Sequence, residues 1–320
     1  MPNRRILINV VRFAVLAVVI WGISRAAANA RASFVEKDLS WQTLRWRWLV
    51  VSAIAYQCGL FLMGCFWYRV LHALHQRPGF FETMRAYYIG HLGKYVPGKA
   101  MVFVLRAGLI RGVHVDTVVA GISVFIETFT MMAVGAFWAV AVLLVRYREI
   151  TTLRWLAIGL MIATVAPTLP PLFRILVRSL RPTFQAHLDE IAAGYTFGLV
   201  VQGWLACTCG WALLAVSFWA TLKAIPYADP LENLATIFPV LLASVALATV
   251  LGFVSLLPGG VGVREWALDW LMLPQIGEVA ALAGAIVLRL VWLLTELLIS
   301  VILYFGLPSP ARDANPSKPD

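Results

Sequence analysis

Long apolar runs alternate with short polar breaks along this chain, and the runs have the length of membrane-spanning helices. A helix of about 20 apolar residues crosses a bilayer. Seven runs approach or exceed this length with few or no charges. They are Ile6–Ile23, Trp48–Tyr68, Thr117–Val145, Trp155–Phe173, Phe197–Leu222, Leu234–Leu257 and Val279–Phe305. The pattern predicts an all-α, polytopic helical membrane protein with about seven or eight transmembrane helices.

Two breaks rich in proline and glycine interrupt the apolar pattern, and each predicts a re-entrant element. The first, Gly93–Lys99, divides the partly apolar stretch Phe80–Ile110, which we expect to form a re-entrant hairpin or a broken crossing. The second, Leu257–Glu265, leads into Val263–Leu273, a segment too short to span. Irregular backbone at membrane depth is tolerated only where protein or a water-filled cavity satisfies its polar groups. Paired breaks of this kind point to a transporter's binding site.

The surroundings of the two breaks are alike, which predicts an internal repeat within one membrane domain, residues 1–306. In each half, about 1–175 and about 190–306, a span leads to a break, then to a cationic stretch, then to a span with buried charge. Pro97 lies 30 residues before Glu127, and Pro258 lies 38 before Glu296. Two unrelated breaks would give the same pattern, and the relative orientation of the halves stays open. Residues 307–320 are predicted to be a disordered tail.

Composition agrees with a membrane protein and adds a basic bias. The 320 residues are 61% hydrophobic and 13% charged, whereas soluble domains carry roughly 25% charged residues. The net charge is +10, and 21 of the 26 Lys and Arg residues lie in residues 1–181. This bias suits anionic headgroups or phosphates, although loops that follow the positive-inside rule show it too. Arg4 and Arg5 favour a cytoplasmic N-terminus in the cell (inner) membrane, with the first helix retained rather than cleaved as a signal peptide.

The first break has the spacing of a nucleotide-binding P-loop but not its chemistry. Gly93 and Gly98-Lys99 are spaced correctly, but Ala100 stands where a Ser or Thr must bind magnesium. The four cysteines and five histidines form no ligand pattern. We therefore expect no nucleotide, no other cofactor and no metal.

Local physics at the first break nevertheless favours an anion. Pro97 suits the first turn of a helix, and Gly98 lets a ligand approach the backbone. Free N–H groups at a helix start favour phosphate, and Lys94, Lys99 and Arg106 supply charge. Juxtamembrane cations that touch headgroups nonspecifically are the alternative.

The second break and three charges within spans complete the candidate set. Gly260 and Gly262 indicate a tight turn, and Arg264 in the following turn suits a ligand or a carboxylate. Arg289 is expected to reach Glu127 or a lipid phosphate; a structural salt bridge, or a proton-coupling role for a buried carboxylate, stays open. The candidate substrate-binding residues are Lys94, Pro97, Gly98, Lys99, Arg106, Glu127, Pro258, Gly259, Gly260, Gly262, Arg264, Glu265, Arg289 and Glu296.

These residues carry a family resemblance that covers essentially the whole chain. The sequence from His91 to Lys99, then Arg106 and Glu127, and later Leu257–Glu265, resembles the lysylphosphatidylglycerol synthase transmembrane, flippase-like family. The resemblance implies a polytopic protein with two re-entrant elements that moves lipids or lipid-linked precursors between leaflets. The lysine-transferring soluble domain of the namesake proteins is not seen up to Asp320, so lysyl transfer is not expected.

Three functions remain open at this point. The first is translocation of an anionic lipid or lipid-linked precursor, with membrane lipids as partners and no nucleic acid. The second is a non-transporting anchor for a biosynthetic enzyme or cell-envelope complex. The third is a glycosyltransferase that uses polyprenyl-phosphate sugars, for which Glu36 and Asp38 in the first loop are the only acidic candidates. We expect the first, in which the protein is not an enzyme.

Overall fold

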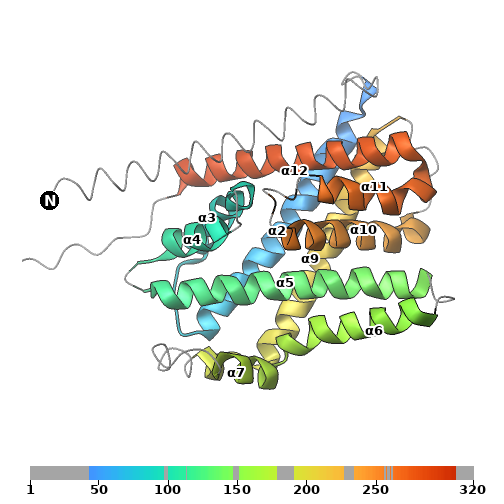
Figure 1. Cartoon of the computed structure of the whole chain (residues 1–320). Coiled ribbons are helices and arrows are strands. Elements are labelled where there is room, and N and C mark those ends of the chain that lie inside the picture. Colours follow the sequence, from blue (N-terminus) through green and yellow to red (C-terminus); the bar gives the residue numbers. More distant parts are fainter. Residues whose placement is uncertain are drawn as a thin grey trace, which may run out of the picture.

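A computed structural model describes residues 43–96, 100–112, 114–146, 151–178, 191–226, 234–255, 257, 260 and 262–307. The regular elements of this part of the chain are all helices (Figure 1). Its helices are α2 (Trp46–Ala73), α3 (Phe80–His91), η2 (Leu92–Tyr95), α4 (Ala100–Ile110), α5 (Thr117–Arg146), α6 (Thr151–Val165), η3 (Ala166–Thr168), α7 (Pro170–Arg178), α9 (Phe197–Ala224), α10 (Leu234–Val254), α11 (Val263–Ile276) and α12 (Glu278–Gly306). The predicted first span Ile6–Ile23 and residues 308–320 of the predicted tail lie outside these ranges.

Five of the helices are long and apolar enough to cross a membrane: α2, α5, α9, α10 and α12. Each corresponds to one of the runs found in the sequence. The prediction of an all-α, polytopic membrane protein is therefore confirmed. The broken stretch between α2 and α5 forms two short helices, α3 and α4, which pack against each other as a hairpin.

The predicted span Trp155–Phe173 is wrong as a single helix. The chain forms α6, a short 3-10 turn and then α7 in its place. Pro167 lies in the turn, and Pro170 and Pro171 open α7. A proline lacks the N–H of the helical ladder and clashes with the preceding turn, so an apolar run alone overestimates this helix.

Helices α2 and α9 form the centre of the bundle and approach each other closely. Gly59 on α2 faces Gly210 on α9, where an added Cβ would lie 3.0 Å from the Gly210 carbonyl oxygen. Further along, the Ser52 hydroxyl lies 2.9 Å from that of Ser217 and 2.8 Å from that of Thr221. Small residues and interhelical hydroxyl contacts are the means by which apolar helices associate in lipid.

The two central helices run in opposite directions. The backbone N–H of Arg45, before α2, donates to the carbonyl oxygen of Ala224, at the end of α9, at 2.9 Å. At the other end, Gly194 before α9 lies against the carbonyl of Ala73. A two-fold axis that exchanges two antiparallel membrane-spanning helices lies in the plane of the membrane. Structural repeats related by such an axis have opposite orientations and are called inverted repeats.

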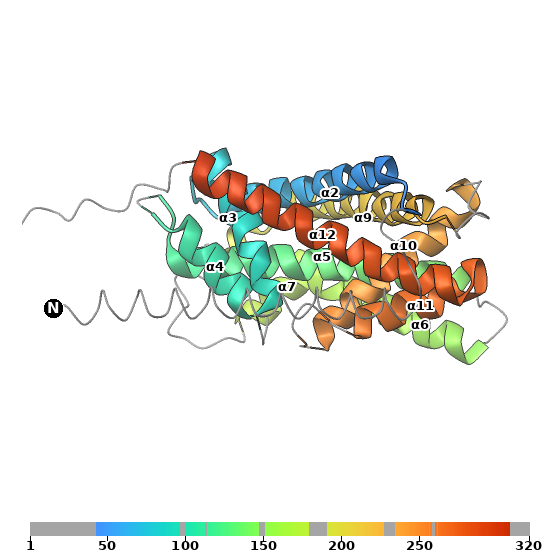
Figure 2. The same cartoon turned by 90° about the horizontal axis from the view of Figure 1, so that it is seen from above.

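The other helices repeat the same set of neighbours around this pair. Helix α3 contacts α2 and α12, while α10 contacts α9 and α5; α4 packs on α5, while α11 packs on α12. In both views the α3–α4 hairpin lies toward one end of the long helices and α11 toward the other (Figures 1 and 2). The described helices thus show the order span, helix pair, span twice, with α3 and α4 as the first pair (the first hairpin) and α10 and α11 as the second (the second hairpin). The internal repeat itself stays a prediction.

We expect an added side chain at the close α2–α9 contact to lower the stability of the protein. A Cβ on Gly203 of α9 would overlap the ring of Phe66 on α2, whereas one on Gly121 of α5 meets nothing within 4 Å. Overpacking costs about 1–3 kcal/mol, so Gly203→Ala should lower the thermal unfolding midpoint of the purified protein in detergent. Gly121→Ala should leave it unchanged or raise it, because alanine favours a helix by about 1 kcal/mol over glycine. Equal midpoints for the two variants would contradict this packing.

Candidate functional site

A buried ion pair joins the first hairpin to α5. Arg106 on α4 donates from Nη1 to Glu127 Oε2 at 2.6 Å, and the Tyr87 hydroxyl donates to Glu127 Oε1 at 3.1 Å. The side chains of Arg106 and Glu127 are 2% and 0% exposed. Removing one member of such a pair leaves the other as an uncompensated charge in a low-dielectric interior.

The guanidinium of Arg106 is held in one place by α3. Its Cζ lies 3.9 Å from the ring centroid of Tyr87 and 5.7 Å from that of Trp67, within cation–π range. A side chain on Gly90 would overlap the Arg106 stem, so the glycine lets α3 and α4 come together. The sequence predicted Arg106 as a phosphate-binding cation; the structure shows it anchored on one side by Glu127.

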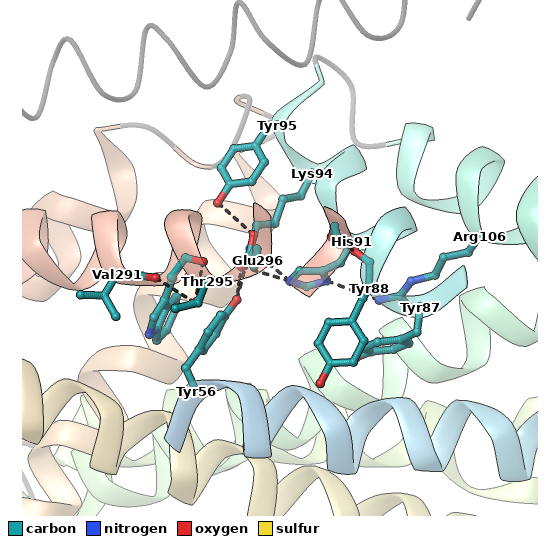
Figure 3. Close-up of polar contacts among 12 residues, drawn as sticks. Tyr56, Tyr87, Tyr88, His91, Lys94, Tyr95, Arg106, Val291, Thr295 and Glu296 are labelled. Atoms are coloured by element: carbon teal, nitrogen blue, oxygen red, sulfur yellow. Dashed lines mark hydrogen bonds and ion pairs between the residues drawn. The ribbon is translucent and has the colours of Figure 1, made fainter. Parts of the chain in front are cut away.

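A second buried carboxylate, Glu296 on α12, gathers hydrogen-bond donors from α2 and from η2. The Tyr56 hydroxyl donates to Oε1, and the Tyr95 hydroxyl donates to Oε2 at 3.1 Å. Lys94 Nζ lies 2.5 Å from Oε1. Figure 3 shows these three side chains pointing toward Glu296. The three donors together satisfy both oxygens of this buried carboxylate.

His91 connects the two clusters. Its Nδ1 lies 3.4 Å from Arg106 Nη2, and its Nε2 lies 3.1 Å from Lys94 Nζ and 3.7 Å from Glu296 Oε1. In Figure 3 the imidazole lies between Glu296 and Arg106. A continuous chain of polar side chains therefore runs from α5 through the first hairpin to α12.

The second break places Arg264 opposite this chain. Gly252 on α10 and Gly260 in the break both lie against the Arg264 side chain, and a Cβ on either would press into it. Gly260 and Gly262 have φ of 67° and 82°, a region that glycine adopts without strain. No carboxylate among the described residues forms an ion pair with Arg264, and its Nε has no hydrogen-bond partner. Its guanidinium is thus left to face the cavity.

Of the alternatives considered for Arg289, the structure shows an interhelical salt bridge and not a pair with Glu127. The guanidinium of Arg289 on α12 forms its ion pair with Glu265, not with Glu127. Glu265 also accepts from the backbone N–H of Gly262 at 2.7 Å and so caps the start of α11. Glu127 is paired with Arg106 instead, because α4 packs directly on α5. The Arg289–Glu265 pair therefore fixes α11 to α12 beside Arg264.

The two breaks face a common cavity of about 70 Å³. Lys94, Arg106 and Arg264 line it together with His91, and no acidic residue is among the described residues of its wall. The rest of the wall is mostly apolar and includes Leu60, Met63, Phe103, Met131, Leu214 and Phe253. The cavity therefore combines positive charge with a hydrophobic surface, as a pocket for an anionic amphiphile would.

The structure brings part of the predicted site together. Lys94, Arg106 and Arg264 reach the cavity, while Glu127, Glu296 and Glu265 hold neighbouring cations from behind. Pro97, Gly98, Lys99, Pro258 and Gly259 lie outside the described residues, so their predicted roles stay predictions.

Sequence reasoning missed four polar residues of the site: Tyr56, Tyr87, His91 and Tyr95. Each hydrogen-bonds a buried carboxylate or contacts a buried cation. His91 stands three residues before Lys94, close enough in a helix to share its face. That spacing was the signal available in the sequence. No group of three or more His, Cys, Asp or Glu within the described ranges is arranged to hold a metal.

The Arg106–Glu127 pair gives a test of the site's electrostatics. Arg106→Gln and Glu127→Gln should each destabilise the protein by about 3–5 kcal/mol, because each leaves a buried charge unpaired. The double variant should lose less than the sum. Arg69→Gln, which removes only the exposed contact to Gln202 at 3.2 Å, should change stability by less than about 0.5 kcal/mol. Thermal unfolding of the wild type, the two single variants and the double variant in detergent gives the coupling energy, and strict additivity would contradict a compensated pair.

Comparison with known sequences bears directly on this arrangement. No match was found among curated proteins. The sequence model for the lysylphosphatidylglycerol synthase TM region matches residues 9–300, which include both breaks, the two buried carboxylates and all three cavity cations. The resemblance drawn from the two motifs is thereby confirmed. The chain belongs to the lysylphosphatidylglycerol synthase transmembrane-region family.

Proposed function

We propose that this integral membrane protein moves an anionic lipid, or a lipid-linked precursor with an anionic headgroup, between the two leaflets. The observation that carries the proposal is the cavity in which Lys94, Arg106 and Arg264 meet without an acidic residue in the described wall. A headgroup that crosses hydrocarbon must exchange its hydration for fixed donors. Three cations supply such donors inside the bundle.

The cavity wall suits the rest of a lipid as well. Leu60, Met63 and Phe103 lie on the same cavity as the cations, together with Met131 and Phe253. Methionine side chains adapt to irregular apolar shapes. A headgroup phosphate held at the cations would therefore place the first carbons of its chains against apolar atoms.

The carboxylates prepare the cations for the ligand. Glu127 holds one edge of Arg106, and Glu296 holds Lys94, before any anion binds. The Nε atoms of Arg106 and Arg264 are buried and have no partner among the described residues. Donors fixed in advance lose little conformational entropy on binding. This arrangement favours a role for the pairs in positioning rather than in direct contact.

The inverted arrangement supports movement rather than static binding. Lys94 and Arg106 come from the first hairpin, and Arg264 comes from the helix after the second break. Transporters built from inverted repeats bind substrate at the repeat interface and expose it to each side in turn. No nucleotide-binding motif is present in the sequence, so we expect exchange that is passive, gradient-driven or driven by a partner.

The first test replaces Arg264. In liposomes that contain the purified protein, labelled phosphatidylglycerol should exchange between leaflets. Arg264→Gln should slow this exchange about tenfold or more, since a hydrogen bond to a charged group contributes about 1.5–3 kcal/mol. Arg111→Gln removes an exposed cation at the end of α4 and should keep the rate within about twofold of the wild type. Equal rates for the two variants would remove the cavity from the mechanism.

The second test changes the lipid instead of the protein. The cationic cavity should favour labelled phosphatidylglycerol over zwitterionic phosphatidylcholine, because the choline ammonium would be brought toward three cations. Exchange of the two lipids is measured in parallel in the same vesicles, with protein-free vesicles as the baseline. A folded protein that exchanges neither lipid would favour the anchoring function, and equal exchange of both would contradict headgroup selection by charge.

A further inference from the structure

His91 lies between two cations. Arg106 Nη2 is 3.4 Å from its Nδ1, and Lys94 Nζ is 3.1 Å from its Nε2. An arginine only donates, and a neutral imidazole accepts at one nitrogen and donates at the other. A lysine ammonium only donates as well, so the neutral ring accepts from one of the two cations and turns its single N–H toward the other.

A second proton on this ring would lie directly beside a cation at either nitrogen, Arg106 at Nδ1 or Lys94 at Nε2. Both neighbouring cations oppose that charge, since Coulomb repulsion between groups a few ångströms apart is strong in a low-dielectric interior. The nearest carboxylate, Glu296, is already held by Lys94, Tyr56 and Tyr95. The surroundings of His91 thus keep the ring neutral while the cavity holds no anion.

The helices that pack around this cluster contribute both charged and neutral groups. Glu127 of α5 lies behind Arg106, and Arg264 of α11 lies across the cavity, with the Arg289–Glu265 pair beside it. Helix α9 contributes the neutral Ser217, which accepts from the indole of Trp292, and α10 contributes Thr249. The only histidine on the cavity wall, among the described residues, is His91.

We infer that the protein binds a proton together with the anion, and that His91 is the group that takes it up. This inference rests on the proposed function, because it concerns the same cavity. An anion bound in the cavity that Arg106 and His91 both line would offset the repulsion that keeps the ring neutral. The proton comes from water and binds the nitrogen that was the acceptor, and the protonated ring, which donates at both nitrogens, then donates to the anion.

Thermodynamic linkage makes the coupling reciprocal: if the anion favours the proton, the proton favours the anion by the same factor. A singly charged headgroup would then enter the bundle with one compensating positive charge. Its passage would carry no net charge across the membrane, so the membrane potential would oppose it little. Movement of the anion and the proton together across the membrane is anion–proton cotransport.

The test measures protons directly. Binding of dioctanoyl phosphatidylglycerol to the purified full chain in detergent is followed by titration calorimetry in two buffers of different ionisation enthalpy. The difference between the two binding enthalpies gives the number of protons taken up. We expect about one proton per anion for the wild type, and an affinity that rises by up to about tenfold per pH unit as pH falls through the range in which the ring is neutral without the anion and protonated with it.

His91→Gln should still bind the anion but take up close to no proton, and His91→Asn serves as a second variant should the first not fold. His114→Gln removes an exposed histidine before α5 and should retain the full proton uptake. A repeat with glycerophosphoglycerol, the same phosphodiester without acyl chains, shows whether the headgroup alone or the whole lipid is the ligand. The proton count is read from whichever of the two binds.

The outcomes separate the two proposals. Binding without proton uptake by the wild type would overturn the coupling and leave the anion site standing. Full uptake by a folded His91 variant would overturn the assignment to His91. A wild type that binds neither anion would contradict the cationic binding site itself, and with it the proposed function.

Discussion

Charge held inside a hydrophobic helical bundle is the constraint on which the rest of this structure depends. Glu127 and Glu296 are almost fully buried on two long helices. An isolated carboxylate in such a place is so unfavourable that it must be paired or protonated. The chain meets this requirement with the α3–η2–α4 hairpin, which packs between α5 and α12 and carries Arg106 and Lys94 to the two acids. The position of the hairpin and the stability of the two buried carboxylates therefore depend on each other.

The same constraint explains several glycines in and beside the two breaks. Gly90 lets α3 approach the stem of Arg106, and Gly252 and Gly260 do the same for Arg264. In both cases a glycine in one helix, α3 or α10, packs against an arginine in the next helix along the chain, α4 or α11. Helix α4, which carries Arg106, and helix α11, which carries Arg264, lie toward opposite ends of the bundle (Figures 1 and 2), and both arginines line the cavity. A cationic site at the interface of the halves follows from this geometry.

Much of the fold could be predicted from the sequence, because the bilayer fixes the length of an apolar helix. Five of the runs form helices of spanning length, and the first break does separate two short helices. The prediction of one span over Trp155–Phe173 was wrong because it gave the hydropathy of this run more weight than its prolines. The neighbours of the charged residues could be predicted less well. Arg289 pairs with Glu265 rather than Glu127, a choice made by which helices pack together and not by spacing along the chain.

The polar partners of the site were harder still to find. Tyr56 stands in an apolar run where a tyrosine has many ordinary roles, and only the packing of α2 on α12 brings its hydroxyl to Glu296. Likewise, a histidine near a lysine is unremarkable in sequence, and its place between two cations depends on the fold of the hairpin. The cations and glycines of the site could be recognised in the sequence, whereas the tyrosines and the histidine that contact them could be identified only from the structure.

The central claim is that an anionic headgroup binds inside the bundle, at the cations of the two hairpins. The most direct measurement is an electron cryomicroscopy structure of the protein in nanodiscs of phosphatidylglycerol, beside one in nanodiscs of phosphatidylcholine. Our account predicts phosphate density within hydrogen-bonding distance of Arg264 and Arg106 in the first, and none there in the second. Anionic lipid found only around the outer surface, with the cavity free of headgroup density in both, would contradict it.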